Sequence, residues 1–126
     1  MSLKNPKFPS SVIFDTIQHE LSSSEVYRNN AIKQASAIFA IVLTNAAGET
    51  DVWHIDLKET GKVGKGPGNN PTAVLLLSET EFGDMVANKV NAQKLFMDGK
   101  LKIKGDVMKA TKVEHILKSA QSKPSL

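Results

Sequence analysis

Few side chains in this sequence of 126 residues could carry out catalysis. It contains no cysteine, which excludes thiolate catalysis, disulfides, cysteine zinc sites and iron–sulfur clusters. His19, His54 and His115 are its only imidazoles, and we expect them on three different elements, which favours surface histidines over metal ligands. No serine lies in the G-x-S-x-G pattern of a nucleophile elbow. We therefore expect a protein that is not an enzyme, with no metal and no cofactor.

A glycine-rich segment, 61–68, contains four glycines and two lysines and could be taken for a phosphate loop. A phosphate loop follows a strand and leads into the N-terminus of a helix. Here Asn69, Asn70 and Pro71 lead into another apolar strand instead. We therefore interpret the segment as a mobile turn between strands.

The basic residues favour an acidic partner, because the net charge is +3 and the pI is near 9.2. Fifteen of the sixteen basic residues are lysines, and Arg28 is the only arginine. Sequence-specific base reading relies on bidentate arginine, so we expect no nucleic-acid partner. Lysines are dense near the end of the chain: Lys100, Lys102, Lys104, Lys109, Lys112, Lys118 and Lys123. They could attract an anionic membrane surface or form a solvated helix face, and both interpretations stay open.

The hydrophobic pattern predicts helices at both ends and in the middle of the chain, with strands between them. Helices are expected over 9–21 and 25–33, and after Ser78, Asn91 and Asp106. Strands are expected over 38–43, 52–58, 61–66, 72–77 and 101–104. Ser10 or Ser11 should cap the first helix, and Ser78 with Glu81 forms a capping box for the third. This order predicts an α+β fold with helices packed on one face of a sheet.

The short helices carry more large apolar side chains than a small sheet needs to cover it. These side chains are Phe82, Met85, Val86, Leu95, Phe96, Met97, Val113, Ile116 and Leu117. Methionine adapts to irregular neighbours, which suits a cavity that accepts varied guests. The pattern alone favours an ordinary core over such a cavity.

The segment 90–106 reads V-N-A-Q-K-L-F-M-D-G-K-L-K-I-K-G-D and resembles the signature of the sterol carrier protein type two family, the nonspecific lipid-transfer proteins. The segment 53–58, W-H-I-D-L-K, is similar to the W-x-x-D-x-K strand of that family, and 77–82 is similar to its strand-to-helix junction. The resemblance extends over nearly the whole chain in order and spacing. Two departures from the signature are present. Ala92 replaces the usual proline, and Phe96, between Leu95 and Met97, is the one aromatic residue retained.

The resemblance implies a five-stranded, mostly antiparallel sheet covered by about five helices, with an internal apolar tunnel. Residues 1–126 would form a single, monomeric lipid-carrier domain that holds a fatty acid, an acyl-CoA or a sterol. Matched by position, the tunnel would be lined by Trp53, Phe82, Met85, Val86, Leu95, Phe96, Met97, Leu101, Thr111, Val113, Ile116 and Leu117. Because Trp53 is among them, ligand binding is expected to change its fluorescence.

A carboxylate head group needs donors or water, because an unpaired charge in an apolar tunnel is costly. Arg28, Lys33 and Gln34 precede the apolar run that starts at Ile38, and Arg28 can offer a carboxylate two parallel hydrogen bonds. We therefore predict that these three residues meet the head group at a mouth of the tunnel. The alternative is that Arg28 is a solvated helix residue.

The last three residues of the sequence bear on the cellular compartment in which the protein is expected. Members of the family often end in a tripeptide such as Ser-Lys-Leu, a peroxisomal address read by an import receptor. This chain ends in Pro124, Ser125 and Leu126, which retains only the leucine. The family implies a peroxisomal protein, and the departure leaves the cytoplasm as an alternative. A lipid-presenting domain of a multifunctional peroxisomal beta-oxidation enzyme is the alternative function, and a lysine-driven adaptor for acidic surfaces is a third.

Overall fold

Five strands form one sheet in the computed structural model, which describes residues 3–122, with side chains up to residue 117. The strands are β1 (Ala37–Thr44), β2 (Thr50–Leu57), β3 (Lys62–Lys65), β4 (Ala73–Ser78) and β5 (Lys102–Gly105). Their order across the sheet is β3-β2-β1-β4-β5. The β1–β4 pair is parallel and the other three pairs are antiparallel. The predicted mostly antiparallel α+β sheet is therefore confirmed.

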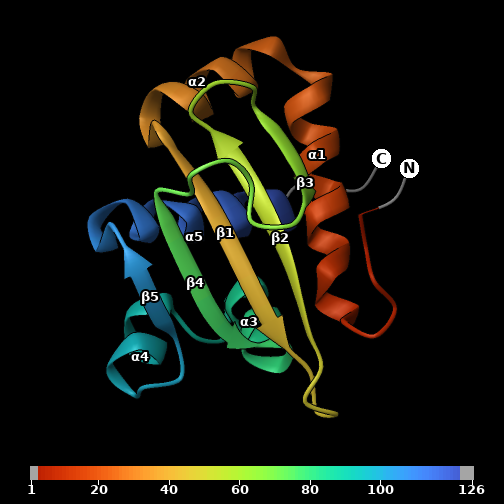
Figure 1. The fold of residues 1–126 in the computed structure, drawn as a ribbon. Helices are drawn as coiled ribbons and strands as arrows, with labels where there is room; N and C mark the ends of the chain where they lie inside the picture. Colours follow the sequence, from red (N-terminus) through yellow and green to blue (C-terminus); the bar gives the residue numbers. More distant parts are fainter. Residues whose placement is uncertain (1–2, 123–126) are drawn as a thin grey trace.

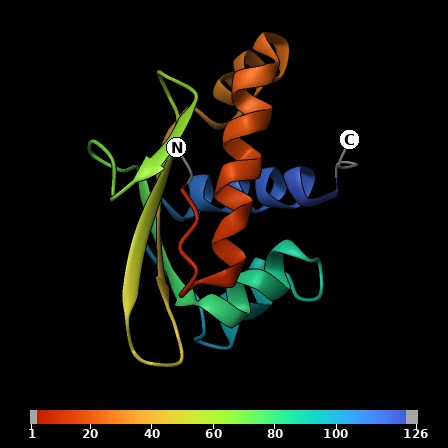
Figure 2. The ribbon, with the colours of Figure 1, turned by 90° about the vertical axis from the view of Figure 1, so that its right-hand side faces the viewer.

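The helices lie together on one face of this sheet, as the hydrophobic pattern predicts (Figures 1 and 2). They are a 3-10 turn η1 (Pro9–Ser11), α1 (Val12–Ser23), α2 (Glu25–Ala35), α3 (Glu79–Val86), α4 (Ala92–Met97) and α5 (Val107–Ser122). In Figure 2, α1 runs along the covered face, α5 crosses it at mid-height, and α3 lies near the lower end of α1. Within the described part of the chain, no helix combines the length and the hydrophobicity needed to span a bilayer.

Side chains alternate along the strands, so that one set faces the helices and the other set lies on the open face. On β2, Trp53, Ile55 and Leu57 are buried, whereas His54 and Asp56 are only partly covered. The central strand β1, which has a neighbouring strand on each side, is buried over most of its length. The core therefore lies between the sheet and the layer of helices.

Local signals set two of the helix starts as predicted. The Ser78 hydroxyl oxygen accepts a hydrogen bond from the Glu81 backbone N–H (3.0 Å), which caps the helix, and donates to the Glu81 carboxylate (2.9 Å). Asn91 caps α4 by accepting from the backbone N–H of Lys94 at 2.7 Å.

The cap predicted for the first helix is wrong. Ser11 precedes α1 in a helical conformation, and its buried hydroxyl forms no cap hydrogen bond. Its oxygen accepts from the Asn5 backbone N–H at 2.8 Å and donates to the Asn5 carbonyl at 3.2 Å. Ser10 is bound to Glu79 instead. Both serines are taken up by contacts outside the helix, and Glu79, the partner of Ser10, is distant in sequence, so the local pattern could not reveal it.

The glycine-rich segment packs against a histidine. A Cβ at Gly64 would lie 2.7 Å from Cε1 of His54, and one at Gly68 would lie 3.0 Å from its Cγ. His54 Nδ1 is hydrogen-bonded to the Gly66 carbonyl at 3.0 Å. Both glycines are therefore explained by close approach to the imidazole. Residues 62–65 form strand β3, in agreement with the predicted strand, so the interpretation of the whole segment as a turn is wrong over these residues.

Candidate ligand-binding cavity

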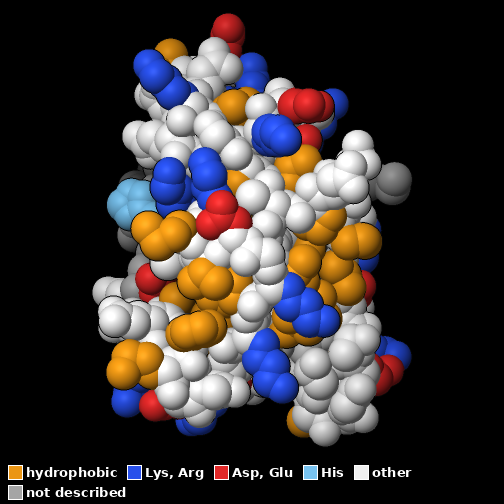
Figure 3. All heavy atoms as spheres, turned by 60° about the vertical axis from the view of Figure 1, so that its left-hand side comes forward, with side chains coloured by type: hydrophobic (Ala, Val, Ile, Leu, Met, Phe, Trp, Pro, Cys, Tyr) orange, Lys and Arg blue, Asp and Glu red, His pale blue; other side chains and the backbone are white. Residues whose placement is uncertain are grey.

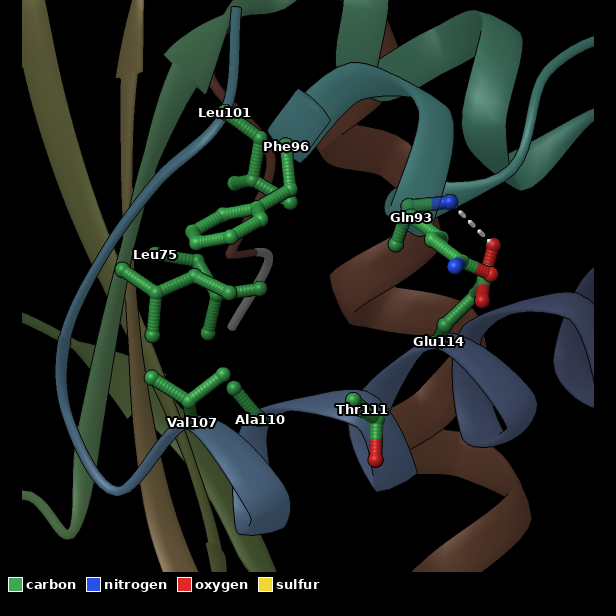
Figure 4. A pocket seen from close by; sticks show the side chains of 10 residues that line it. Leu75, Gln93, Phe96, Leu101, Val107, Ala110, Thr111 and Glu114 are labelled. Carbon is green, nitrogen blue, oxygen red and sulfur yellow. Dashed lines mark hydrogen bonds between the residues drawn. The ribbon is translucent and has the colours of Figure 1, made fainter. Parts of the chain in front are cut away.

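A cavity of about 350 Å³ lies between β4, α4, β5 and α5, at one edge of the sheet. Its wall consists of Leu75, Ala92, Gln93, Phe96, Leu101, Ile103, Val107, Ala110, Thr111 and Glu114 (Figure 4). Seven of these ten residues are hydrophobic. Small-molecule sites are usually concave, mostly apolar and roughly 300–1,000 Å³ in volume. The cavity therefore has the character of a site for an apolar guest.

The six-residue helix α4 forms one wall and is held in place at both ends. At its start, the Ala92 backbone N–H donates to the Glu114 carboxylate of α5 at 2.6 Å, a favourable charge at a helix N-terminus. At its end, Gly99 adopts a φ of +76°, which glycine allows without strain, and the chain turns back. The Leu101 N–H then donates to the Leu95 carbonyl at 3.1 Å. This turn places Leu101 beside Phe96 in the wall.

The sheet forms the opposite wall. Leu75 of β4 and Ile103 of β5 are register partners, and both side chains line the cavity. At the end of β5, Gly105 has a φ of +87°, and a Cβ there would lie 2.5 Å from the Thr72 carbonyl oxygen. Gly105 thus lets the chain pass close to β4 and enter α5, whose first turns contribute Val107, Ala110 and Thr111.

The cavity opens to the surface between α4 and the first turn of α5. Phe96 and Val107 both line it, yet each is 45% exposed. Phe96 points inward toward Leu75 in Figure 4. Their chain neighbours Met97 and Met108 are 75% and 79% exposed. The mouth is therefore bordered by the half-exposed side chains of Phe96 and Val107.

Two further cavities, with more polar walls, lie between α5 and α2. One, of about 450 Å³, is lined by Gln34, Ala35, Thr111, Lys112, His115 and Ile116. The other, of about 230 Å³, is lined by Tyr27, Asn30, Ala31, Gln34, His115 and Ile116. Thr111 belongs to both the first and the second cavity, so the three hollows succeed one another along α5.

The structure brings only part of the predicted tunnel wall to these cavities. Phe96, Leu101 and Thr111 line the apolar cavity, and Ile116 lines the two beside α2. Seven further predicted residues are buried and line none of the three: Trp53, Phe82, Met85, Val86, Leu95, Val113 and Leu117. Met97 is exposed. Contact of these eight with a guest stays a prediction.

Trp53 and Phe82 belong to an aromatic stack within the core. The Phe14 ring lies parallel to Trp53, with centroids 4.9 Å apart, and to Phe82 at 5.4 Å. Phe8 meets Trp53 edge-on at 5.8 Å. The Trp53 indole N–H donates to the Leu3 carbonyl at 2.8 Å. Protein groups thus occupy both faces and the polar edge of the Trp53 ring.

The three predicted head-group residues are separated. Arg28 donates from Nη1 to the Leu21 carbonyl at 2.9 Å, at the C-terminal end of α1, and packs against Gly61. Lys33 is exposed and lines none of the three cavities. Gln34 lines both of the cavities beside α2. The assignment of the head group to this set stays a prediction, and only Gln34 lies at a cavity.

Sequence reasoning missed seven residues of the apolar cavity, which lie on several elements: Leu75, Ala92, Gln93, Ile103, Val107, Ala110 and Glu114. Two signals could have found some of them. Pairing the fourth and fifth predicted strands would have placed Leu75 beside Ile103, and Ala110 is a small residue within the apolar stripe of α5.

Within the described residues, no group of three or more acidic or histidine side chains could hold a metal ion.

Comparison with known proteins assigns the chain to a family. The model described as "SCP-2 sterol transfer family" matches residues 14–118. A protein named "Fatty acid-binding protein" from Yarrowia lipolytica is 48% identical, over 97% of this chain and 98% of the relative. The "Oleate-induced peroxisomal protein POX18" of Candida maltosa is 38% identical over the full length of both. The structure of "Sterol Carrier Protein 2 from Yarrowia Lipolytica (apo form)" matches with a TM-score of 0.89 and 47% identity, over 98% of this chain and 100% of that one.

Enzymes of the same family match over a small part of their length. The "Peroxisomal multifunctional enzyme type 2" of Mus musculus is 32% identical over 86% of this chain, but only 15% of the enzyme is covered. The fold is shared by the palmitate complex of a sterol carrier protein from Aedes aegypti, with a TM-score of 0.66 and 19% identity, over 87% of this chain and 94% of that one.

Proposed function

The chain belongs to the SCP-2 sterol transfer family, and from that premise we propose that it binds and transfers a lipid, with the acyl chain in the apolar cavity beside Phe96. The guest is a long-chain fatty acid, a fatty acyl-CoA or a sterol. The observation that carries the proposal is an apolar cavity with an open mouth, built by the same segment, 90–106, that bears the family signature. The name of the Yarrowia relative supports a fatty acid as the first guest to test.

The free energy of apolar burial is sufficient for a carrier. Each buried CH₂ group contributes roughly 0.8 kcal/mol, so a sixteen-carbon chain offers on the order of 10 kcal/mol before the cost of ordering it. Binding in the micromolar to nanomolar range would be tight enough to carry the lipid and loose enough to release it. Because the cavity is near the small end of known sites, a longer guest would extend past Thr111 toward the cavities beside α2, which makes the expected tunnel.

A carrier is favoured over a lipid-presenting domain of a multifunctional enzyme. Two relatives that match this chain over nearly all of both lengths are named as a fatty acid-binding protein and an oleate-induced peroxisomal protein. The multifunctional enzyme contains a matching region within a much longer chain. The catalytic steps of such enzymes are therefore not assigned to this chain.

Location in the peroxisome follows from the same comparison. The Candida relative is named as a peroxisomal protein induced by oleate, a fatty acid. The tail Pro124, Ser125 and Leu126, on which an import receptor would act, lies outside the described residues. Deleting these three residues should leave a fluorescently tagged protein in the cytoplasm while lipid binding persists. Entry of the truncated protein into peroxisomes would show that the tail is not the signal.

Lipid binding can be measured directly on delipidated protein. A fluorescent polyene fatty acid should bind with one-to-one stoichiometry, and oleate should displace it. Lipid extraction followed by mass spectrometry should identify a guest in freshly purified protein. No saturable fluorescence change together with no co-purified lipid would refute the carrier function.

A further inference from the structure

The helix α4 is joined to α5 by a hydrogen bond in the wall of the apolar cavity. The Glu114 carboxylate of α5 accepts from the Ala92 backbone N–H at 2.6 Å, and both residues line the cavity (Figure 4). Among the residues that the structure describes, the other hydrogen bonds of α4 all lie within residues 91–101. The attachment of α4 to α5 therefore depends on this carboxylate and on apolar packing.

Apolar packing holds α4 only weakly. Of its six residues Leu95 is buried, whereas Phe96 and Met97 are 45% and 75% exposed. Figure 3 brings this side of the molecule forward and shows hydrophobic side chains at its surface. Segments with few buried apolar contacts open locally at a low cost in free energy. We therefore expect α4 to be the part of the cavity wall that opens most readily.

Residues with a left-handed backbone conformation flank α4 on both sides. Asn88 has a φ of +65° and Gly99 a φ of +76°, so the segment 89–98 lies between two sharp bends of the chain. Hinges are usually a few loop or element-terminal residues that absorb changes in φ and ψ. Movement of the segment about these bends would carry Phe96, which points toward Leu75, away from the sheet and widen the cavity mouth.

We propose that Glu114 controls the rate of lipid exchange: its bond to the Ala92 N–H determines how often α4 opens, and α4 must open for a lipid to enter or leave. Glu114 is thus a positioning residue, which acts through α4. The inference rests on the proposed function for the identity of the guest. Ala92 stands where the signature that this segment resembles has proline, and proline has no N–H, so the bond depends on this departure.

Ala92→Pro removes the donor of this bond and leaves the carboxylate in place. The backbone accepts the change, because proline is favoured at the first position of a helix and the preceding Asn91 is extended, with φ −102° and ψ 160°. A hydrogen bond to a charged group corresponds to a factor of roughly ten in an equilibrium constant. Stopped-flow mixing with the fluorescent fatty acid should therefore show association and release that are both faster by roughly tenfold.

The equal rise of both rates distinguishes control of exchange from a merely structural contact. The Ala92–Glu114 bond is present in the closed protein with and without a guest, so its loss should change Kd by less than about twofold. A contact that only shaped the cavity wall would raise Kd through faster release and leave association unchanged. That result would overturn the proposal.

Glu114→Gln is the graded variant. Its amide oxygen can still accept from the Ala92 N–H, but a neutral hydrogen bond is about half as strong, so both rates should rise by roughly threefold. In the Ala92→Pro background the same substitution should have no further effect, because the donor is already absent. Additive effects would show that Glu114 acts on exchange through another contact, which would overturn the proposal.

Glu79→Gln on α3 is the matched control. The Glu79 carboxylate accepts from the Ser10 backbone N–H at 2.5 Å, a similar bond between residues that line none of the three cavities. Both rates should stay within about twofold of wild type. Acceleration equal to that of Glu114→Gln would assign the effect to a general loosening of the fold and overturn the proposal.

Hydrogen exchange of the delipidated protein separates this proposal from the proposed function. A helix of six residues is not stable in isolation, so the bonds from the Leu95 and Asp98 amides should open when α4 leaves α5. Ala92→Pro should accelerate exchange of both amides by roughly tenfold, and Glu79→Gln should not. Unchanged exchange in a protein that binds fatty acid would overturn the role of Glu114 and leave the carrier function intact. Accelerated exchange in a protein that binds no fatty acid would refute the carrier function and, with it, the control of lipid exchange, leaving only the attachment of α4 by Glu114.

Discussion

Two regions beneath the helices contain similar aromatic residues but are packed differently. One, the closed end, is the aromatic stack around Trp53, and the other, the open end, is the cavity beside Phe96. Four of the five phenylalanines are at most 2% exposed, and three of them, Phe8, Phe14 and Phe82, join the aromatic stack around Trp53. The fifth, Phe96, is 45% exposed and faces a cavity. The closed end has protein on all sides of its rings, whereas the open end leaves one side of its ring to a guest or to water.

This difference divides stability from binding. Buried aromatic side chains stabilise a fold by the area they bury and by ring-to-ring contacts. A wall that borders empty space forfeits part of its dispersion contacts until a ligand restores them. The closed end therefore holds the molecule together, and the open end gives up some packing energy to accommodate a lipid.

The largest expected contrast is between alanine substitutions at the two ends. Phe14→Ala removes the central ring of the stack and should lower the free energy of unfolding by about 3–5 kcal/mol. Phe96→Ala should cost no more than about 1 kcal/mol, because its ring is half exposed and borders the cavity. Urea unfolding of delipidated protein measures both. A loss at Phe96 that equals the loss at Phe14 would make it an ordinary core residue.

Adding side-chain volume at the cavity wall and in the fully packed core should produce opposite results. Ala110 lines the cavity, so Ala110→Leu should fit without strain and weaken fatty-acid binding at least tenfold. Ala37 is fully buried and lines none of the three cavities, so Ala37→Leu should cost about 1–3 kcal/mol of stability through overpacking and leave binding intact. Fluorescent displacement and urea unfolding distinguish the outcomes. Tight binding by Ala110→Leu would move the guest to another cavity.

The fold could be predicted from the sequence more completely than the site. Strand alternation and the cap at Ser78 are local signals, and they located the sheet and the start of α3. An apolar stripe, however, does not reveal whether the space that it faces is occupied. Phe82 and Phe96 look alike in sequence, and only tertiary packing places one against Phe14 and the other against a cavity. The same dependence on distant partners explains Ser10, which binds Glu79 instead of capping the first helix.

An acid titration should weaken the closed end. Burial raises the pKa of Asp51, but hydrogen bonds from Lys65 and Asn5 outweigh it and hold the pKa below its usual value. The ammonium of Lys65 also lies 4.0 Å from the centre of the Trp53 ring, so the pair covers the aromatic stack. With a lowered pKa in the folded state, this contribution is present above the unfolded pKa of about 4 and is lost as the pH falls further.

The consequence is a difference between wild type and Asp51→Asn that depends on pH. At neutral pH the variant should be less stable by about 0.5–1 kcal/mol, because the ion pair is only partly buried. Near pH 3 the difference should shrink, since the Asp51 carboxylate of the unfolded chain binds a proton below about pH 4, whereas the lowered pKa of the folded state opposes protonation there. Lys65→Met keeps an apolar side chain over the Trp53 ring. Like Asp51→Asn, it should make the free energy of unfolding depend less on pH than in wild type. If the free energies of unfolding of wild type and Asp51→Asn differ by the same amount at every pH, the effect is due to packing and not to the charge.

The smallest expected effect is on the emission of Trp53. The sequence placed this residue in the tunnel wall, and ligand binding was expected to change its fluorescence. In the structure its ring is covered by Phe14, Phe8 and Lys65, and its N–H is bound to Leu3, so a guest beside Phe96 would leave its surroundings nearly unchanged. Wild type titrated with oleate, which has no fluorescence of its own, should therefore show little change in emission.

A tryptophan moved to the open end provides the matched comparison. In a Trp53→Phe background, Phe96→Trp places an indole at the cavity mouth, where water now reaches half of the side chain. Oleate should shift its emission to shorter wavelength, because the acyl chain replaces water around the ring. Urea unfolding checks that the double variant is folded. A strong response from Trp53 and none from the indole at position 96 would reverse the comparison: the guest would then enter the aromatic end, among the side chains that the sequence had first suggested.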